Sequence, residues 1–317
     1  MHETLILNLY DIGCKNNCVF CGKFIRITKS LADKIAKKEL KKLNYLKENK
    51  NIKCIIISGN DPIEYYNLVE FLKKIKKVTD VNVFFQSHCI DFEDFDYLKN
   101  VLDIGIIGSI QVPIYGHNEK IHDSITQNSG SFKSVIRTLE NLKKMSFNNI
   151  QLHTLILKQN EDYIFELFSF LSEFEYRIDA SLPCIPSFNG RYLNRHLKNI
   201  PDLNKVSEGF KKIKKSIKNL DKIFIHDIPF CIAPLDLKNI NFSNDLDRKA
   251  HGGYDHLKNS DIDTIIIDKE IIPTYRILSK DETCKNCVLD KVCFGIIKPY
   301  VELGIFKAKP FSKRYMN

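Results

Sequence analysis

"TLILNLYDIGCKNNCVFCGK", residues 4–23, joins an apolar, β-rich run to three closely spaced cysteines, Cys14, Cys18 and Cys21. The apolar run predicts a strand over residues 4–10. The cysteines follow at positions i, i+4 and i+7, which is also the spacing of one face of a helix. The spacing alone therefore leaves three interpretations: a buried helical stripe, a zinc knuckle, or a site for less common metal chemistry.

The surroundings of the three cysteines argue against the first two interpretations. The segment also contains Gly13, Asn16, Asn17 and Gly22, which favour turns. The next predicted helix has a start of its own, with Ser30 as the expected N-cap. Zinc needs a fourth ligand, and no His or Cys follows close by in the sequence. Three thiolates on one loop can instead hold three irons of a cubane cluster and leave one iron without a protein ligand.

Length and composition predict one large domain, or one large and one small domain. The chain has 317 residues, 44% of them hydrophobic, and no apolar run of 18 residues that would cross a membrane. The first residues, "MHETLILNLYDIG", lack the features of a signal peptide. We therefore expect a cytoplasmic protein whose ten cysteines do not form disulfides.

The net charge of +9 is concentrated before residue 221, because residues 221–317 hold 15 Lys/Arg against 14 Asp/Glu. Many of these lysines fall on the polar faces of predicted helices, and we interpret them as solvated surface. A nucleic-acid partner is not expected on this evidence. A basic surface that attracts an acidic peptide or RNA stays open as the alternative.

Short β-rich runs alternate with amphipathic helices over the first 230 residues. This alternation predicts parallel strands joined by right-handed crossovers. The fold class is therefore α/β, as an open or partial (β/α)6 TIM-like barrel, with chemistry at the C-terminal ends of the strands. Expected strands are 4–10, 53–58, 81–87, 104–112, 150–157 and 177–183, with 222–228 as a possible seventh; expected helices lie near 30–48, 63–77, 91–100, 130–145, 161–174 and 202–219.

The alternation of β-rich runs and amphipathic helices ends near residue 231, which predicts a domain boundary. We expect a barrel domain over residues 1–230 and a small C-terminal domain over 231–317. Within the latter, 241–261 is polar and is predicted to be a loop, and 262–278 is compatible with a hairpin.

"CKNNCVFC" resembles the Cys-x-x-x-Cys-x-aromatic-Cys signature of radical S-adenosylmethionine (SAM) enzymes, on the loop where that family has it. The resemblance implies that Cys14, Cys18 and Cys21 hold a 4Fe-4S cluster whose open iron binds the amino and carboxylate groups of SAM. Phe20 would pack near the adenine. In this family the reduced cluster cleaves SAM to a 5′-deoxyadenosyl radical, which abstracts a substrate hydrogen.

"SGNDP", residues 58–62, matches the Gly-Gly-Glu-Pro-type motif of the same family. By resemblance, Ser58, Gly59, Asn60 and Asp61 would hold the SAM amino group. This copy has Ser58 in place of the first glycine and Asp61 in place of glutamate. The aspartate retains the acceptor but has a shorter reach.

Further positions extend the resemblance over about residues 4–230. Gln111 is the candidate for contact with the ribose, with Ser109 as the second choice. Thr126 occupies the position where relatives often carry an arginine for the SAM carboxylate, so that partner stays open. Ile156 and Leu157 are expected to pack on the adenine side.

A second cysteine group, "CKNCVLDKVC", supplies Cys284, Cys287 and Cys293, and Cys231 is the expected fourth ligand. A four-cysteine zinc ribbon and a second iron–sulfur cluster both fit these residues. The group resembles the SPASM-like or shorter Twitch-like extensions of radical SAM enzymes, which favours one auxiliary 4Fe-4S cluster, with zinc as the alternative. Four ligands would suit electron transfer or architecture, whereas three would leave an iron open for substrate.

The resemblance implies a radical SAM enzyme, and because tails of this kind are frequent among peptide-maturing relatives, it favours a ribosomally made peptide as the substrate. Flavodoxin or ferredoxin is the expected electron donor, and no membrane partner is expected. Catalytic residues beyond the cofactor site are not assigned. No leader-binding extension precedes the first predicted strand, so peptide recognition would use the barrel or a separate partner. Alternative substrates are a small sugar or nucleoside precursor, which would be dehydrogenated or epimerised, or a tRNA base. A non-enzyme alternative is an iron–sulfur or zinc scaffold or regulatory protein.

Overall fold

The computed structural model describes residues 3–10, 13–21, 27–48, 51–183, 197–217, 220–235, 278–293 and 295–312. The predicted loop at 241–261 and nearly all of the predicted hairpin at 262–278 lie outside these residues. Seven strands are assigned to one sheet in the order β1-β2-β3-β4-β5-β6-β7, which follows the sequence. The paired strands β1–β2, β2–β3, β3–β4 and β6–β7 are parallel. The predicted α/β class with the parallel strands of a partial TIM-like barrel is confirmed, including the seventh strand.

The chain divides into two compact units. The first comprises residues 1–114 and 126–152, with 244–272 outside the described part. Its elements are β1 (Glu3–Leu9), α1 (Lys29–Lys41), η1 (Lys42–Asn44), α2 (Tyr45–Glu48), β2 (Ile52–Gly59), η2 (Pro62–Glu64), α3 (Leu68–Lys76), β3 (Asn82–Gln86), η3 (Ile90–Glu93), α4 (Phe95–Leu102), β4 (Ile107–Pro113) and α6 (Ser131–Lys144).

The second unit comprises residues 115–125, 153–243 and 273–317. Strand β5 (Ile150–Leu155) begins in the first unit and ends in the second. The other elements of the second unit are α5 (Glu119–Thr126), η4 (Glu161–Tyr163), α7 (Ile164–Ser172), β6 (Arg177–Ser181), α9 (Leu203–Ser216), η5 (Leu220–Lys222), β7 (Ile223–His226), β8 (Leu278–Ser279), η8 (Glu282–Asn286), β9 (Ile296–Ile297) and α12 (Lys298–Glu302). The short strands β8 and β9 pair in antiparallel fashion.

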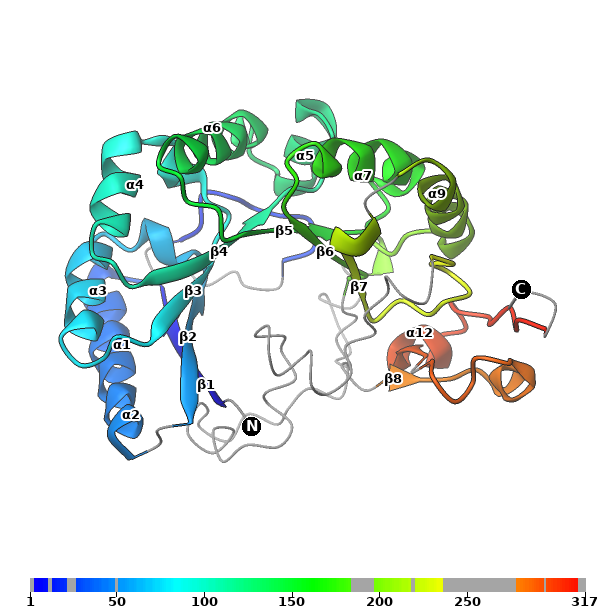
Figure 1. Ribbon diagram of the computed structural model, residues 1–317, viewed down its shortest axis with the longest axis horizontal. Helices are drawn as coiled ribbons and strands as arrows, with labels where there is room; N and C mark the ends of the chain where they lie inside the picture. The colour runs from blue at the N-terminus through cyan, green and yellow to red at the C-terminus, as the bar shows by residue number, and fades with distance from the viewer. Residues whose placement is uncertain are drawn as a thin grey trace. The chain divides into compact units, whose positions relative to one another are not determined.

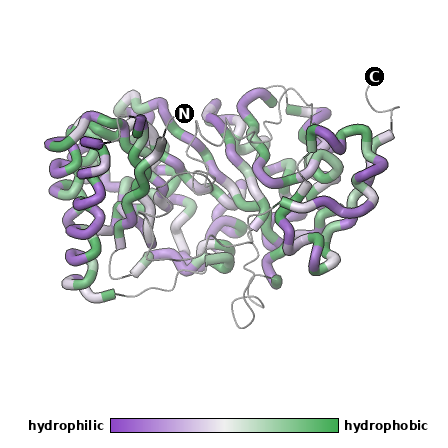
Figure 2. The backbone as a smooth tube through the Cα atoms, turned by 90° about the horizontal axis from the view of Figure 1, so that it is seen from below, coloured by the Kyte–Doolittle hydropathy of each residue, from purple (hydrophilic) through white to green (hydrophobic). Residues whose placement is uncertain are grey.

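The core of the first unit lies between β1–β4 and the helices along one face of these strands (Figure 1). Alternate residues of a strand share a face, and the helix-covered face of β1 carries Leu5, Leu7 and Leu9, each 0–1% exposed. Ile55 and Ile57 of β2 are likewise fully buried. Each such side chain contributes about 1.5–3 kcal/mol by leaving water. The helices alternate between hydrophilic and hydrophobic residues along their length, as Figure 2 shows.

The core of the second unit follows the same rule. Ile178 and Ala180 of β6 and Ile223 and Ile225 of β7 are buried. Phe168 of α7 meets Phe210 of α9 edge to face, with ring centroids 5.4 Å apart. None of the helices in the described part of the chain has the length and hydropathy that a membrane-spanning segment requires.

One expected detail was wrong. Helix α1 is capped by Thr28 and not by Ser30, because the Thr28 hydroxyl accepts the N–H of Leu31 at 3.3 Å. Thr28 has the extended backbone that an N-cap requires, whereas Ser30 already lies inside the helix.

Candidate metal centres

The cysteine loop, residues 13–21, follows β1 and carries three half-buried thiols, Cys14, Cys18 and Cys21. The N–H of Cys21 donates to the carbonyl of Cys18 at 3.0 Å, which puts both residues in one turn. Burial raises the pKa of the Cys18 thiol, and the neighbouring Cys21 and Cys14 thiols raise it further. Thiols that affect one another's charge in this way lie close together. The nine described cysteines form no disulfide.

Two sets of hydrogen bonds fix the loop between Cys14 and Cys18. In the first, the Glu64 carboxylate, at the end of η2, accepts the backbone N–H of Lys15 at 2.9 and 3.2 Å. The Lys15 ammonium group also pairs with Asp91 of η3. The elements that follow β2 and β3 therefore hold the residue next to the first cysteine.

The second set comes from the segment that joins α5 to α6. The carbonyl of Thr126 accepts the N–H of Asn17 at 2.9 Å, and the Asn128 amide donates to the Asn16 side chain at 2.9 Å. The Thr126 side chain is fully buried and bonds to Ser131 at 2.7 Å. Thr126 thus supports the loop through its backbone, and a side-chain contact to the SAM carboxylate stays a prediction.

The "SGNDP" segment begins in β2, where Ser58 and Gly59 pair with Asn8 and Leu9 of β1. Gly59 has a φ of +149°, and a Cβ at this position would lie 1.6 Å from the Leu9 carbonyl oxygen. Only glycine therefore allows β1 and β2 to approach so closely where the cysteine loop leaves the sheet.

Asp61, in the same segment, is 1% exposed and uses both carboxylate oxygens inside the protein. Oδ1 accepts from Ser87 Oγ at 2.7 Å and from the N–H of Ile63 at 3.2 Å, and Oδ2 accepts the N–H of His88 at 2.6 Å. Burial raises the pKa of this carboxyl group. Neighbouring Asn60 is half-buried. The predicted contact of these residues with the SAM amino group stays a prediction.

His88 and Glu64 lie beside Cys14. His88 Nε2 is 2.6 Å from Glu64 Oε1 and 3.1 Å from Asp61 Oδ2. A ring nitrogen of His88, a carboxylate oxygen of Glu64 and the Cys14 sulfur all lie within 4.8 Å of one another. Burial opposes a charge on His88, but Asp61 and hydrogen bonds to Cys14 and Glu64 outweigh it and raise its pKa.

Sequence reasoning missed both neighbours of Cys14. Their signal is positional: Glu64 follows β2 and His88 follows β3, and parallel strands bring their C-terminal ends to one edge. No histidine follows the cysteines closely in the sequence, but the fold brings His88 near Cys14.

The other predicted SAM contacts occupy two places. Phe20 is half-buried in the loop, and Ser109 and Gln111 lie on one face of β4, paired with Phe84 and Gln86 of β3. Ile156 and Leu157 belong to the second unit and are fully buried. Contacts of all five with SAM stay predictions.

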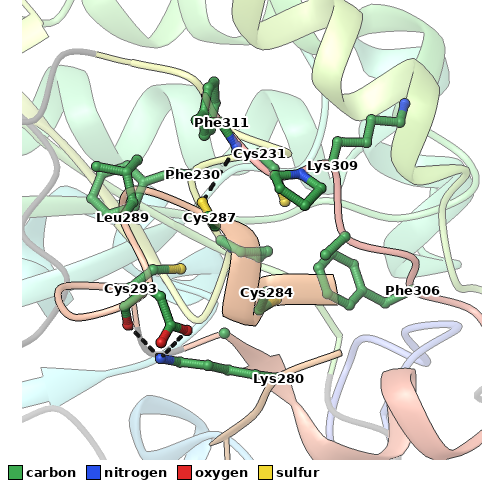
Figure 3. Close-up of a pocket in the computed structure, with 15 residues that line it drawn as sticks. Phe230, Cys231, Lys280, Cys284, Cys287, Leu289, Cys293, Phe306, Lys309 and Phe311 are labelled. Carbon is green, nitrogen blue, oxygen red and sulfur yellow. Dashed lines mark hydrogen bonds and ion pairs between the residues drawn. The ribbon is translucent and has the colours of Figure 1, made fainter. Parts of the chain in front are cut away.

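The tail centre brings Cys231, Cys284, Cys287 and Cys293 to one pocket (Figure 3). All four thiols are half-buried. Burial raises the pKa of Cys231 to about 11, with further contributions from Cys293 and Cys284. The predicted fourth cysteine thus joins the three of the tail, although it lies more than fifty residues before them in the chain.

The surroundings of the tail thiols are largely apolar. Short turns position them, since the N–H of Cys287 donates to Cys284 and that of Cys293 to Leu289, at 2.9 and 2.8 Å. The backbone N–H of Phe311 donates to the Cys287 sulfur at 3.3 Å. Apolar pocket residues are Pro229, Phe230, Leu289, Phe306, Ala308, Pro310 and Phe311.

Both donor sets fit the groups that the sequence predicts. Three half-buried thiols within eight residues of one loop suit an iron–sulfur cluster with one open iron. Four thiols with an N–H···S hydrogen bond and an apolar surround match a closed centre, for which a 4Fe-4S cluster and zinc are both chemically suitable.

The comparisons with known proteins concern the family and the fold. The sequence model of the radical SAM superfamily matches residues 12–171. Streptococcus suis SuiB bound to precursor peptide SuiA is similar in structure, with a TM-score of 0.55 and 15% identity over 97% of this chain and 74% of that chain. For SuiB bound to S-adenosylmethionine, the TM-score is 0.51 with 16% identity, over 97% and 75% of the two chains.

A further SuiB structure matches over 71% of this chain and 49% of that chain, so this chain spans about half of it; the TM-score is 0.46 with 15% identity. No curated protein matches the sequence. At these identities the structural similarities establish the fold alone.

Proposed function

This chain belongs to the radical SAM superfamily and is a radical SAM enzyme, and from this premise we propose that it abstracts a hydrogen atom from a ribosomally made peptide. Cys14, Cys18 and Cys21 would hold the 4Fe-4S cluster. When SAM is bound and reduced there, the centre supplies a 5′-deoxyadenosyl radical. The observation that carries the assignment is the loop itself: three half-buried thiols within eight residues, on a segment that hydrogen bonds from its neighbours fix in place.

The chain's own residues orient the centre. Glu64 and Asp91 fix Lys15, and Thr126 and Asn128 fix Asn17 and Asn16. The proposed SAM-binding residues are those that the family resemblance marks: Phe20, Ser58, Gly59, Asn60, Asp61, Ser109, Gln111, Thr126, Ile156 and Leu157.

The peptide substrate is supported by two observations. SuiB, which shares this fold over nearly the whole chain, has been solved with a precursor peptide. The tail also gathers four cysteines, as expected for an auxiliary centre. We propose a second 4Fe-4S cluster at Cys231, Cys284, Cys287 and Cys293, with zinc as the alternative, and a flavodoxin- or ferredoxin-type electron donor in the cytoplasm. A sugar or nucleoside precursor, or a tRNA base, is the alternative substrate.

The test of the activity needs no substrate. The protein is reconstituted anaerobically with iron and sulfide, then given SAM and dithionite, and 5′-deoxyadenosine is measured. We expect product from the wild type and at least a thousandfold less from the Cys14→Ala/Cys18→Ala/Cys21→Ala variant. Absence of product from fully loaded wild type would favour the scaffold or regulatory alternative.

The same triple variant tests the tail centre, because it should retain one iron–sulfur spectrum. A colourless, zinc-containing variant would contradict the second cluster. The substrate class is tested by coexpression with a short peptide encoded beside the gene, where a mass change that depends on Cys14, Cys18 and Cys21 is expected. An unchanged peptide mass would favour the small-molecule or tRNA alternatives.

A further inference from the structure

His88 occupies a position beside the cysteine loop that the family signature does not assign. Its side chain is 9% exposed and lies among Cys14, Asp61 and Glu64. The side chain of Asp61 is 2% exposed and that of Glu64 is 7% exposed. A buried imidazole that pairs with two acidic groups and lies within 4.8 Å of the Cys14 sulfur calls for a functional explanation.

The protons on the ring decide what His88 can do. The backbone N–H of Ile90 points at Nδ1 from 3.2 Å, so in a neutral ring Nδ1 is the acceptor and the hydrogen sits on Nε2. In a protonated ring both nitrogens carry hydrogen. In either state Nε2 presents an N–H and not a lone pair toward Glu64, and a ring nitrogen lies within 4.8 Å of the Cys14 sulfur. His88 is therefore set up as a hydrogen-bond donor and not as a metal ligand, although Cys, His and Glu together resemble a zinc set.

Asp61 and Glu64 determine where this donor lies. Asp61 accepts the backbone N–H of His88 at 2.6 Å and the hydroxyl of Ser87 at 2.7 Å, which fixes the turn after β3. Glu64 accepts from His88 Nε2 at 2.6 Å and from the N–H of Lys15 at 2.9 Å, which ties the ring to the residue after Cys14. Both acids are thus committed to placing the imidazole against the loop.

We propose that, in the loaded centre, His88 shares its single Nε2–H between Glu64 and the Cys14 thiolate and thereby raises the reduction potential of that centre, with Asp61 and Glu64 as positioning residues. The inference rests on the proposed cluster at Cys14, Cys18 and Cys21. Hydrogen bonds to cluster sulfurs are one of the protein's means of setting the potential. A donor stabilises the additional negative charge of the reduced cluster, and here it also separates the thiolate from two buried carboxylates.

The test is an anaerobic redox titration of the reconstituted full-length protein, without SAM or substrate, followed by electron paramagnetic resonance. The signal of this centre is the one absent from the Cys14→Ala/Cys18→Ala/Cys21→Ala variant. A hydrogen bond to a charged group is stronger than one between neutral groups. We therefore expect His88→Leu to reduce the equilibrium constant for reduction about tenfold, a lower potential by about 59 mV for one electron.

Two further variants distinguish the loss of the hydrogen-bond donor from the loss of side-chain packing at His88. His88→Gln retains an amide N–H on a side chain of suitable length and should keep the potential near that of the wild type. Ser87→Ala should lower the potential partway, because it removes the hydroxyl that fixes Asp61 and the turn that carries His88 without changing any charge. The proposal is overturned if fully loaded His88→Leu has the wild-type potential. Where His88→Leu does not bind iron, a wild-type potential in fully loaded Ser87→Ala overturns it.

Zinc content provides an independent check. If His88 were a ligand, a Cys18→Ala/Cys21→Ala variant would retain zinc at Cys14, Glu64 and His88 and would lose it on further change of His88 to Leu; that result would also overturn the proposal. Because potentials and metal contents need neither SAM nor substrate, they remain informative if 5′-deoxyadenosine is not formed. Conversely, an unchanged potential leaves the proposed SAM cleavage intact.

Discussion

The cysteine loop and the tail centre both gather thiols, but the protein fixes them by different means. Glu64 and Thr126 hold the backbone of the loop, and Asn128 holds the side chain of Asn16. The tail thiols lie instead among apolar side chains, with two-residue strands and a five-residue 3-10 helix around them.

This difference predicts whether each segment is ordered before its metal binds or only afterwards. Hydrogen bonds from strand ends that are stable without metal can order the loop before a cluster arrives. Segments as short as β8, η8 and β9 bury little surface and gain most of their order from a bound metal. The loop should therefore be an open, prepared site, and the tail a closed site whose fold depends on its metal.

Loss of the tail metal should have the largest effect. In the Cys284→Ala/Cys287→Ala variant we expect residues 278–312 to lose their protection from hydrogen exchange, because structural metal sites supply on the order of 10 kcal/mol. Exchange followed by mass spectrometry measures this, with the Cys14→Ala/Cys18→Ala/Cys21→Ala variant as the matched control in which residues 13–21 should stay protected. Equal protection of 278–312 with and without metal would remove the distinction between the two sites.

Gly59→Ala should have the next largest effect, because it damages the strand pair from which the loop emerges. The new Cβ would lie 1.6 Å from the Leu9 carbonyl oxygen, so β1 and β2 must separate. We expect a loss of about 3 kcal/mol or more in the free energy of unfolding, measured with urea. Gly105→Ala is the matched control: its φ is +70° but open space surrounds it, so only about 1 kcal/mol should be lost. Similar losses at both glycines would contradict the close approach.

Acid should weaken the second unit, which carries the tail, through His122. This residue is 1% exposed, its Nδ1 accepts the N–H of Tyr115 at 3.2 Å, and burial lowers its pKa to about 4, against the smaller opposing effect of Asp123. In the unfolded chain the pKa of His122 is near 6.5, so protons bind the unfolded chain more readily than the folded protein below that pH. The contribution of neutral His122 to the free energy of unfolding is therefore complete above pH 6.5 and is lost as the pH falls toward 4. The full loss is roughly 3 kcal/mol.

Urea unfolding between pH 7.5 and 4.5 measures this slope. His122→Asn keeps an acceptor for Tyr115 but does not titrate in this range, so its stability should fall less with acid. The same slope in both proteins would assign the acid sensitivity to other groups.

The sequence was sufficient to predict the strands, since long β-branched runs such as "KCIIIS" suit only a buried parallel strand. It was less informative where a side chain ends an element early. The helix expected over 63–77 divides into η2 and α3, because Asp61 caps η2 through Ile63 before α3 begins at Leu68. Helix α5 was not predicted, although the family resemblance had marked its last residue, Thr126.

At the two centres, the spacing of the cysteines in the sequence predicted which of them lie together. The residues that hydrogen-bond to the cysteine loop became known only from the fold. The residues Cys14, Cys18 and Cys21 are near one another in the chain, so local spacing was informative. Glu64, His88 and Asn128 reach the loop only through strand register and loop path, which no local pattern contains. The domain boundary near residue 231 stays a prediction.

Removal of one hydrogen bond from the prepared loop should have the smallest effect on stability. Asn128→Ala deletes the amide that donates to the Asn16 side chain at 2.9 Å, while the bond between Asn17 and Thr126 stays. A hydrogen bond of this kind contributes about 1 kcal/mol, so the unfolding midpoint should change little. The order of the loop depends more directly on this hydrogen bond, so iron uptake at limiting iron and sulfide should be slower than in the wild type.

Asp91→Asn, which removes a partly exposed ion pair of Lys15, is the matched control and should slow iron uptake less. Equal uptake rates in all three proteins would mean that the loop is ordered by its metal after all, as the tail is.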